Sequence, residues 1–289
     1  MINEIEAKSI LLYNKNPQNW FGVHYYLNIY RGCTHGCIYC DTRSECYKID
    51  NFDKEINVKI NAVNLLTKEL AKKRKKGLIG FGSTTDPYIP LEAKYRLTRE
   101  ALKIVRDYHN PLFLLTKSDL VLSDIDIISE INNDTSACIA FTITTANDKL
   151  ASIIEPNAPK PSSRFKAMKT LTDKGIKCGI LIMPVLPFIT DKKENIEEIV
   201  CNASLSGVSF IYFYPALTLR DRQRDYFYQH ISDNLKKKYI STYGSSYNCN
   251  ALNYRELMNY FNDLCIKYNI KYDMQDCGNE KASIQTELF

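Results

Sequence analysis

The sequence has no long, uninterrupted hydrophobic run. Its longest apolar stretch, residues 179–189, is broken by Pro184 and Pro187 and is too short for a bilayer, which needs about 20 apolar residues. The first ten residues, MINEIEAKSI, also lack the basic and then apolar pattern of a secretory leader. We therefore expect a cytoplasmic protein with no membrane partner.

A strong charge imbalance and regular repeats are also missing. The 38 Lys and Arg residues against 33 Asp and Glu residues leave a net charge of only +5, which permits an acidic partner without requiring one. We find no internal repeat and no low-complexity linker. With 289 residues, of which 45% are hydrophobic, the chain can bury one large core.

The ten cysteines do not indicate disulfides, because a reducing compartment keeps thiols free. Cys249, Cys265 and Cys277 are too widely spaced to hold a metal cluster together. Three others are close neighbours in the stretch YRGCTHGCIYC, which contains Cys33, Cys37 and Cys40. This stretch is the most informative part of the sequence.

Three close thiolates favour a four-iron cluster over zinc. A structural zinc site normally takes four protein ligands, and His35, inside the loop, would have to point back at the same ion. Three thiolates suit three corners of a [4Fe–4S] cluster and leave one iron open to another ligand. Gly32 and Gly36 permit the unusual backbone angles that such a loop needs. Three buried or zinc-binding cysteines remain the alternative.

The rest of the chain alternates between strand-like and helix-like patterns. The strand-like segments are residues 24–30, 77–83, 111–118, 136–145, 176–184 and 208–215. The helix-like segments are residues 61–72, 97–108, 122–131, 163–175, 191–204 and 252–268. This alternation predicts an α/β protein with a parallel barrel or a doubly wound sheet. In both, chemistry lies at the carboxyl ends of the strands.

The spacing C-x-x-x-C-x-x-C, with Tyr39 before the last cysteine, resembles that of the radical S-adenosylmethionine (SAM) enzymes. Five further blocks, GSTTDPY, LTKS, FTITT, EPNAP and GILIMPVLP, resemble the spore photoproduct lyase-like branch, often labelled DNA repair photolyases. The resemblance implies a partial (β/α)6 TIM-like barrel that binds one [4Fe–4S] cluster through Cys33, Cys37 and Cys40, together with SAM. We expect residues 1–215 to form this core with an N-terminal extension, and residues 216–289 to form a C-terminal extension of the same domain.

The resemblance also places SAM contacts at the strand ends. It implies that Lys117 pairs with a carboxylate and that Thr142 and Thr144, two residues apart on a strand, face the ribose together. The expected cofactor contacts are Tyr39, Ser83, Thr85, Asp86, Lys117, Thr142, Thr144, Glu155 and Arg164. For each polar residue taken alone, an ordinary cap or surface hydrogen bond is the alternative.

The match to the lyase fails at two positions. The lyase carries its hydrogen-donating cysteine where this chain has Ser83, whose O–H bond is too strong to donate a hydrogen atom readily. It carries a tyrosine after its last cluster cysteine, where this chain has Asp41. Cys46 is a candidate substitute as the catalytic radical partner, with a plain buried thiol as the alternative.

The resemblance further implies a one-electron donor of the flavodoxin or ferredoxin type. Our leading substrate hypothesis is a lesion or modified base in DNA or RNA. Four tyrosines with interspersed arginines could stack bases and bind phosphates, although a buried strand and a solvated turn explain them as well. These residues are Tyr212, Tyr214, Tyr226, Tyr228, Arg220, Arg222 and Arg224. A radical modification of a peptide or small molecule, and a non-catalytic zinc- or cluster-binding nucleic acid module, are the alternatives.

The chain ends in QTELF, which resembles the pentapeptide by which bacterial DNA-maintenance proteins bind the sliding clamp. Gln285 would supply the amide, and Leu288 and Phe289 the apolar anchors. A terminus packed against the barrel is the alternative.

Overall fold

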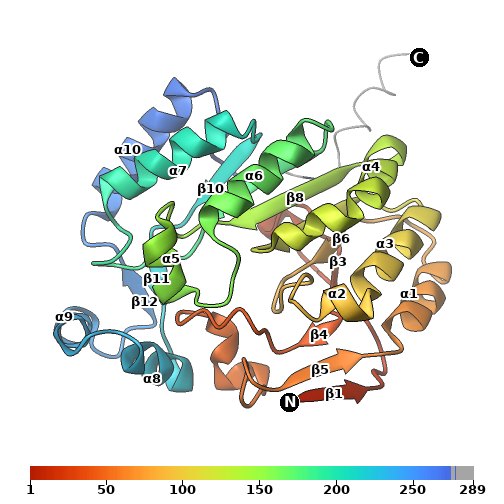
Figure 1. Cartoon of the computed structure of the whole chain (residues 1–289), viewed down its shortest axis with the longest axis horizontal. Coiled ribbons are helices and arrows are strands. Elements are labelled where there is room, and N and C mark those ends of the chain that lie inside the picture. Colours follow the sequence, from red (N-terminus) through yellow and green to blue (C-terminus); the bar gives the residue numbers. More distant parts are fainter. Residues whose placement is uncertain (275–276, 278–289) are drawn as a thin grey trace.

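The computed structural model describes residues 1–274 and 277. At its centre is a seven-stranded sheet with the spatial order β10-β9-β8-β7-β6-β3-β2 (Figure 1). All neighbouring strands are parallel except β2 and β3. The strands are β2 (Leu11–Tyr13), β3 (Tyr25–Leu27), β6 (Ile79–Phe81), β7 (Leu112–Thr116), β8 (Ala137–Thr142), β9 (Lys177–Ile182) and β10 (Phe210–Phe213).

The helices cover one face of this sheet. They are α1 (Ala62–Ala71), α2 (Glu92–Tyr95), α3 (Leu97–Asp107), α4 (Ile125–Asp134), α5 (Asp148–Ile154), α6 (Pro161–Thr172) and α7 (Lys193–Leu205). Because side chains alternate along a strand, Leu112 and Leu114 face the helices while Phe113 packs on the other face. There Phe113 stacks on Phe21, with ring centroids 5.0 Å apart, and fills the barrel interior.

The strand order settles which of the two predicted architectures is present. From β3 to β10, each strand pairs with the next parallel strand in the sequence, so the order never reverses as it does in a doubly wound sheet. Strands β10 and β2 form the two edges of the sheet. The predicted partial (β/α)6 barrel is confirmed, and the doubly wound alternative is wrong.

The first predicted strand, residues 24–30, is divided in two. β3 belongs to the barrel sheet, whereas β4 (Tyr30–Arg31) belongs to a second sheet with β5 (Ile56–Lys59) and β1 (Ile2–Ile5). The division falls at Asn28, whose Nδ2 donates to Ser83 Oγ (2.8 Å) and whose Oδ1 accepts from the Thr84 amide (3.3 Å). These bonds tie the chain to the end of β6 and redirect it toward the cysteine loop.

From Ala216 the chain leaves the barrel. It forms β11 (Ala216–Thr218), α8 (Asp221–Gln229), α9 (Asp233–Tyr243), β12 (Asn248–Asn250) and α10 (Tyr254–Lys267). Helix α10 packs on α7, whereas α8 and α9 lie at the lower left of Figure 1, where α8 contacts the short 3-10 helices η2 (Asp41–Arg43) and η3 (Glu45–Tyr47) that follow the cysteine loop. A separate apolar cluster joins α8 and α9 to the cysteine loop through Cys37, Ile38 and Tyr39.

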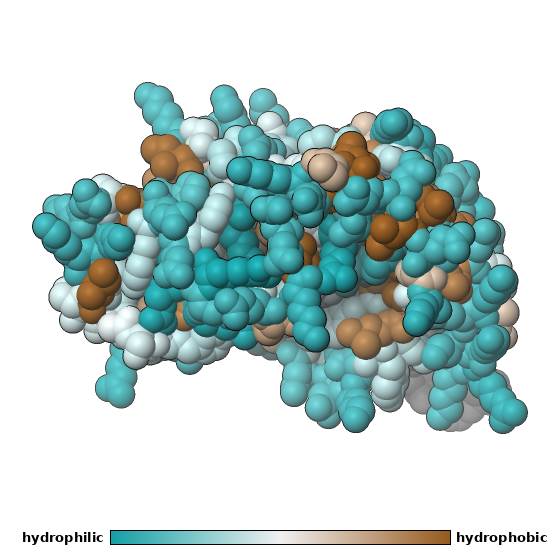
Figure 2. Space-filling view, turned by 90° about the horizontal axis from the view of Figure 1, so that it is seen from below, coloured by the Kyte–Doolittle hydropathy of each residue, from teal (hydrophilic) through white to brown (hydrophobic). Residues whose placement is uncertain are grey.

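No helix in the described part of the chain is both long and apolar enough to cross a membrane. The face seen from below is covered mainly by hydrophilic side chains (Figure 2). The predicted clamp-binding residues Gln285, Leu288 and Phe289 lie outside the described residues.

Candidate active site

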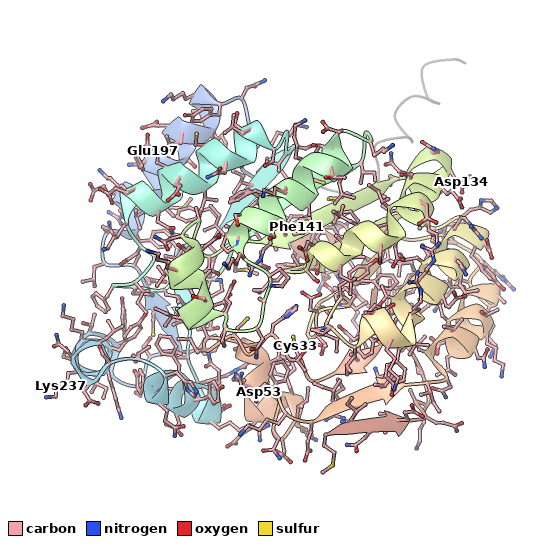
Figure 3. All side chains as sticks on the ribbon, viewed as in Figure 1. Cys33, Asp53, Asp134, Phe141, Glu197 and Lys237 are labelled. Carbon is pink, nitrogen blue, oxygen red and sulfur yellow. The ribbon has the colours of Figure 1, made fainter. Side chains whose placement is uncertain are left out.

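A cavity of about 340 Å³ opens at the carboxyl ends of the barrel strands, and all three neighbouring cysteines line it. They come from the loop between β4 and the short 3-10 helix η2 (Asp41–Arg43). Cys33 and Cys37 are buried, and Cys40 is partly exposed. Figure 3 shows Cys33 near the centre of the molecule, beside the end of the N-terminal sheet.

The loop depends on glycine at its start. Gly32 has a φ of +94°, and a Cβ atom there would lie 2.9 Å from the Phe52 carbonyl oxygen. Any L side chain would therefore meet both backbone strain and a clash. The same carbonyl oxygen accepts a bond from the Cys33 amide (2.9 Å). Burial raises the pKa of the Cys37 thiol to about 12, so that, without a metal, this thiol is protonated.

Asp86 connects the cysteine loop to two strand ends. Its carboxylate accepts bonds from the Thr116 hydroxyl (2.7 Å), the Lys117 amide (2.7 Å) and the Tyr88 amide (2.9 Å). His35 Nε2 lies 3.2 Å from its Oδ2. Burial alone would raise the pKa of Asp86, but His35 and these bonds more than offset it and lower the pKa to about 2. The structure thus places Asp86 in the cavity wall, already bonded to protein donors.

Of the nine predicted cofactor contacts, six line the cavity: Tyr39, Ser83, Thr85, Asp86, Lys117 and Thr142. Ser83 is exposed, whereas the buried Thr85 Oγ1 has no hydrogen-bond partner. The Lys117 ammonium lies 5.7 Å from the centroid of the Tyr39 ring. Burial lowers the pKa of Lys117, but Cys37 and Glu155 more than offset this and raise it. A positive charge and a free hydroxyl therefore face the same space.

The other three predicted contacts, Thr144, Glu155 and Arg164, lie behind Tyr39. The Tyr39 hydroxyl donates to Glu155 Oε1 and lies 3.1 Å from Thr144 Oγ1. Arg164, which is fully buried, pairs with Glu155 and donates to the Thr142 carbonyl oxygen (2.9 Å). Burial raises the pKa of Glu155, but Arg164 and Lys117 more than offset this and lower it. These residues hold the wall of the cavity and do not line it.

The C-terminal part of the chain closes one side of the cavity. Thr218 lines it, and Arg220 Nη2 donates to Asp41 Oδ2 (2.7 Å). Gln223, on α8, is fully buried and donates to the carbonyl oxygens of Tyr39 (3.2 Å) and Thr218 (2.9 Å). Thus Asp41, which directly follows the last cysteine of the loop, anchors the start of α8 beside that loop.

Cys46 is not brought to this cavity. It lies in η3 (Glu45–Tyr47), is exposed, and accepts a bond from the Ser44 hydroxyl (3.4 Å). The alternative interpretation of Cys46 as a buried thiol is wrong, because Ser44, not Cys46, points into the protein at this turn. Its catalytic role stays a prediction that no cavity contact supports.

The tyrosine and arginine stretch does not form one surface. Only Tyr214 of the seven residues lines the cavity, and Tyr228 is buried. The arginines hold loops together: Arg224, for example, donates to the carbonyl oxygens of Leu219 (2.8 Å) and Ser246 (2.6 Å). The sequence could not show this, because the carbonyl partners have no pattern of their own: those of Arg224 lie 5 and 22 residues away, and those of Arg222 lie 173 and 179 residues away.

Two further kinds of residue were missed by sequence reasoning. Met183, Pro184 and Thr218 line the cavity, although only the block GILIMPVLP pointed to any of them. Arg43, 6% exposed, donates from Nε to the Cys37 carbonyl oxygen (3.2 Å). Its position three residues after the last cysteine was the only signal.

The donor set suits a cluster with a further ligand. Within the described residues, no three His, Cys, Asp or Glu side chains are grouped closely enough to hold one metal ion. In a [4Fe–4S] cluster each thiolate binds a different iron, so its ligands need not converge on a single point. The thiols, the unpartnered Thr85 hydroxyl and the cationic Lys117 all border one cavity. The residues present therefore fit a cluster with a cofactor beside it that carries a carboxylate and further hydrogen-bonding groups.

A partial (β/α)6 barrel with three cysteines in the loop beside its first strand defines an enzyme class. Residues 27–200 match the family model of the Radical SAM superfamily. The chain belongs to the radical SAM superfamily, and it is an enzyme of this class. It uses a [4Fe–4S] cluster and SAM for radical chemistry, and it needs an electron donor.

Several relatives have no described activity. An uncharacterized protein of Methanocaldococcus jannaschii is 35% identical over 199 residues, 68% of this chain and 72% of the relative. One from Mycobacterium tuberculosis is 28% identical over 232 residues, 78% of this chain and 67% of the relative. The Radical SAM Nalpha-GlyT isomerase of Pseudomonas phage M6 is 25% identical over 157 residues, 54% of this chain and 32% of that protein.

Solved structures share the fold. Spore photoproduct lyase complexed with dinucleoside spore photoproduct superposes with a TM-score of 0.66 at 15% identity, over 92% of this chain and 79% of that one. Streptococcus suis SuiB bound to the precursor peptide SuiA gives a TM-score of 0.54 at 15% identity, over 89% of this chain and 49% of that one. At such identities these likenesses show the fold alone.

Proposed function

We propose that Cys33, Cys37 and Cys40 hold the [4Fe–4S] cluster and that SAM binds beside it in the same cavity. When bound, the cluster and SAM together supply a 5′-deoxyadenosyl radical that abstracts a hydrogen atom from the substrate. The observation that carries this proposal is the single cavity bordered by the three thiols, Lys117 and the unpartnered Thr85 hydroxyl. The non-catalytic zinc module is set aside, because the chain belongs to an enzyme superfamily.

The protein's own residues bind and orient the cofactor. Lys117 offers an ammonium whose raised pKa keeps it charged, which suits the SAM carboxylate. Thr85 Oγ1, which has no hydrogen-bond partner in the protein, can bond to a polar atom of SAM. This bond removes the free-energy cost of a buried, unsatisfied hydroxyl. Leu115 and Met183 supply apolar wall, which keeps water away from a reactive species.

Tyr39 in the cavity wall, with Glu155 and Arg164 behind it, acts in positioning the loop. Their bonds run from the cysteine loop to α6 and to the end of β8. They fix the loop relative to the strand ends. Direct SAM contact by Glu155 or Arg164, as the resemblance implied, is the weaker proposal because neither lines the cavity.

For the substrate we propose a lesion or modified base in a nucleic acid. One comparison supports this choice: the fold is shared with a lyase solved with a dinucleoside photoproduct. Tyr214 lines the cavity and offers an aromatic ring on which a base can stack. A flavodoxin or ferredoxin as the donor, a sliding clamp as partner and a cytoplasmic location stay predictions.

The first test is SAM cleavage. The wild-type protein, reconstituted anaerobically with iron and sulfide and reduced with dithionite, should convert SAM to 5′-deoxyadenosine, which chromatography detects. Cys37→Ala should abolish this, whereas Cys201→Ala, a cysteine on α7 outside the cavity wall, should not. An iron-free protein with one tightly bound zinc would refute the proposal.

The substrate needs a separate test. DNA carrying deuterated thymidine, either intact or irradiated, is offered together with SAM, and mass spectrometry follows deuterium in the 5′-deoxyadenosine formed. Transfer from DNA is expected. Transfer only from deuterated peptides added in a parallel reaction would replace the nucleic acid proposal with the peptide alternative.

A further inference from the structure

A second pocket lies on the outer side of the cysteine loop. It has a volume of about 300 Å³ and is lined by Arg43, Phe52, Asp53 and Tyr226, with Lys54 and Gln229 among its other lining residues. We call it the outer pocket. Phe52 lines both the outer pocket and the main cavity. Phe52 is therefore part of the wall of both spaces.

Two of the cysteines are bonded directly to this dividing wall. The Cys33 amide donates to the Phe52 carbonyl oxygen (2.9 Å), and Arg43 Nε donates to the Cys37 carbonyl oxygen (3.2 Å). Figure 3 shows Cys33 and Asp53 near each other. These two bonds connect the lining of the outer pocket directly to the cysteine loop.

The wall is a stack of planar groups. The His230 and Tyr226 rings stack with centroids 4.0 Å apart, and the Arg43 guanidinium carbon lies 3.6 Å from the Tyr226 centroid. The same carbon lies 5.4 Å from the centroid of Phe52. The stack therefore runs from His230, which is exposed, to Phe52, which is 4% exposed.

The two arginines of the outer pocket are already paired with carboxylates. Asp53 accepts from Arg43 Nη2 (3.2 Å) and from the Tyr226 hydroxyl (3.1 Å). Arg222 is bonded to Asp50 Oδ1 (2.5 Å) and to the Arg43 carbonyl oxygen (2.8 Å). A small polar ligand would have to break these bonds, whereas a protein can rest on the stack without doing so. The outer pocket is better suited to a protein surface than to a metabolite.

We propose that the outer pocket is the docking site of the one-electron donor, an acidic protein of the flavodoxin or ferredoxin class. This inference rests on the proposed ligands of the cluster. The donor gives up one electron and is oxidised by one electron; the cluster gains that electron and is reduced by one. No bond forms or breaks between the two proteins. The donor and the substrate then occupy different pockets and do not compete for the same space.

The charge on this side agrees with such a partner. The lining holds Arg43, Lys54 and Arg222 against Asp53 and Asp225, an excess of one positive charge. Lys54 is exposed. Electron-transfer partners meet through small, transient interfaces, in which complementary charge sets the association rate and its salt dependence. The outer pocket is small enough for such an interface, and its positive charges complement those of an acidic donor.

The first test reverses charge at the edge of the outer pocket. The variant Lys54→Glu/Gln229→Glu changes the net charge by −3 without touching the cysteine loop or the stack. The control, Lys237→Glu/Asn234→Asp, makes the same net change on exposed positions of α9, where Lys237 lies far from Asp53 (Figure 3). SAM cleavage is measured with dithionite, with a bacterial flavodoxin and with a bacterial ferredoxin, both reduced enzymatically.

We expect Lys54→Glu/Gln229→Glu to lose at least fivefold in rate with the protein donor that supports wild-type cleavage, and to keep its rate with dithionite. The control should keep both rates. Equal losses in variant and control would overturn the docking site, as would wild-type cleavage by neither protein donor. Failure of wild-type cleavage with dithionite would instead refute the proposed function.

The second test does not require activity. Carbodiimide joins a lysine ammonium to a carboxylate in contact with it, so mixing the protein with each donor should give a cross-link at Lys54, located by mass spectrometry. Added 0.5 M salt should suppress it. Cross-links confined to lysines on other faces, such as α1 or α9, would overturn the docking site whatever the cleavage assay shows.

Discussion

The molecule contains two buried Tyr–Glu pairs that are alike in chemistry and opposite in electrostatics. Beside the cavity, Tyr39 donates to Glu155, which Arg164 also contacts. Away from it, Tyr30 donates to Glu92, which accepts from the amides of Thr98 (2.8 Å) and Arg99 (3.3 Å). The pKa of Glu155 is lowered, whereas burial raises that of Glu92 to about 7.

The two glutamates differ in pKa because a buried arginine, Arg164, pairs with Glu155, whereas Glu92 is bonded by neutral donors. Glu92 bonds the first amides of α3, a task that needs a hydrogen-bond acceptor and tolerates protonation. Glu155 is kept ionised by Arg164, at the cost of burying two charges. A permanent charge behind Tyr39 also helps to keep Lys117 protonated. We therefore assign the Glu92 pair to stability and the Glu155 pair to the site.

The largest expected effect comes from removing the cation. Arg164→Leu leaves the buried Glu155 carboxylate without its ion-pair partner and should lower the free energy of unfolding by about 3–5 kcal/mol, measured by urea denaturation. Arg164→Leu/Glu155→Gln should recover part of this loss, because no charge is then left unpaired. If Arg164→Leu lowers the free energy of unfolding by less than about 1 kcal/mol, Glu155 is not held ionised by Arg164. The two Tyr–Glu pairs would then not differ in the charge of their glutamate.

The second prediction concerns pH. The folded-state pKa of Glu92, about 7, lies above its ordinary value of 4.5. Its stabilising contribution is therefore fully present below pH 4.5 and is lost as the pH rises through 7. The wild type should lose about 3 kcal/mol relative to Glu92→Gln over this interval.

The measurement is the free energy of unfolding of both proteins at several pH values from 4.5 to 8. If the unfolding free energies of the wild type and Glu92→Gln differ by the same amount at every pH, Glu92 remains ionised throughout. This result would contradict the raised pKa of Glu92 and the contrast with Glu155.

A smaller effect distinguishes the tyrosines. Tyr39→Phe leaves an ionised buried carboxylate oxygen without its donor, which should cost about 2–3 kcal/mol of unfolding free energy. Tyr30→Phe should cost only about 1 kcal/mol, because Glu92 keeps two amide donors and can take up a proton. Thermal denaturation at pH 6 measures both. Equal losses would argue against a special role for the Tyr39 pair.

The smallest effect concerns the unpartnered hydroxyl of the cavity. Thr85→Val should change stability by only a few tenths of a kcal/mol but weaken SAM binding about fivefold to tenfold, roughly 1 kcal/mol. Equilibrium dialysis of the reconstituted protein measures the affinity. The control is Thr98→Val, which removes a buried hydroxyl that donates to the Pro87 carbonyl oxygen (2.8 Å). This variant should lower stability and leave SAM affinity unchanged. The reverse pattern would exclude Thr85 as a SAM contact.

The barrel could be predicted from sequence because each strand and helix has its own local pattern. Apolar runs such as residues 111–118 have the length and punctuation of buried strands, and β7 lies there. The break at Asn28 could not be predicted, because it depends on Ser83 and Thr84, more than 50 residues away. The N-terminal strand β1 pairs with β5 in the same non-local way.

The candidate site shows the same limit. Residues that follow a strand end, such as Thr85 and Lys117, lie in the cavity wall, since the carboxyl ends of parallel strands meet at one edge; their contact with SAM stays a prediction. Glu155 and Arg164 lie outside strands, and only the fold shows that they stand behind Tyr39. The residues that join the C-terminal part to the loop, Arg220 and Gln223, belong to no motif, and their bonds span 179 and 184 residues.

These long spans have a consequence for how the protein is made. The cysteine loop leaves the ribosome well before α8, because Asp41 precedes its partner Arg220 by 179 residues. At typical rates of synthesis this interval is roughly 10 to 40 s. During that time the thiols exist without the helix that later packs beside them. The order of the chain thus provides a period in which iron and sulfide can reach the loop before the C-terminal part closes over it.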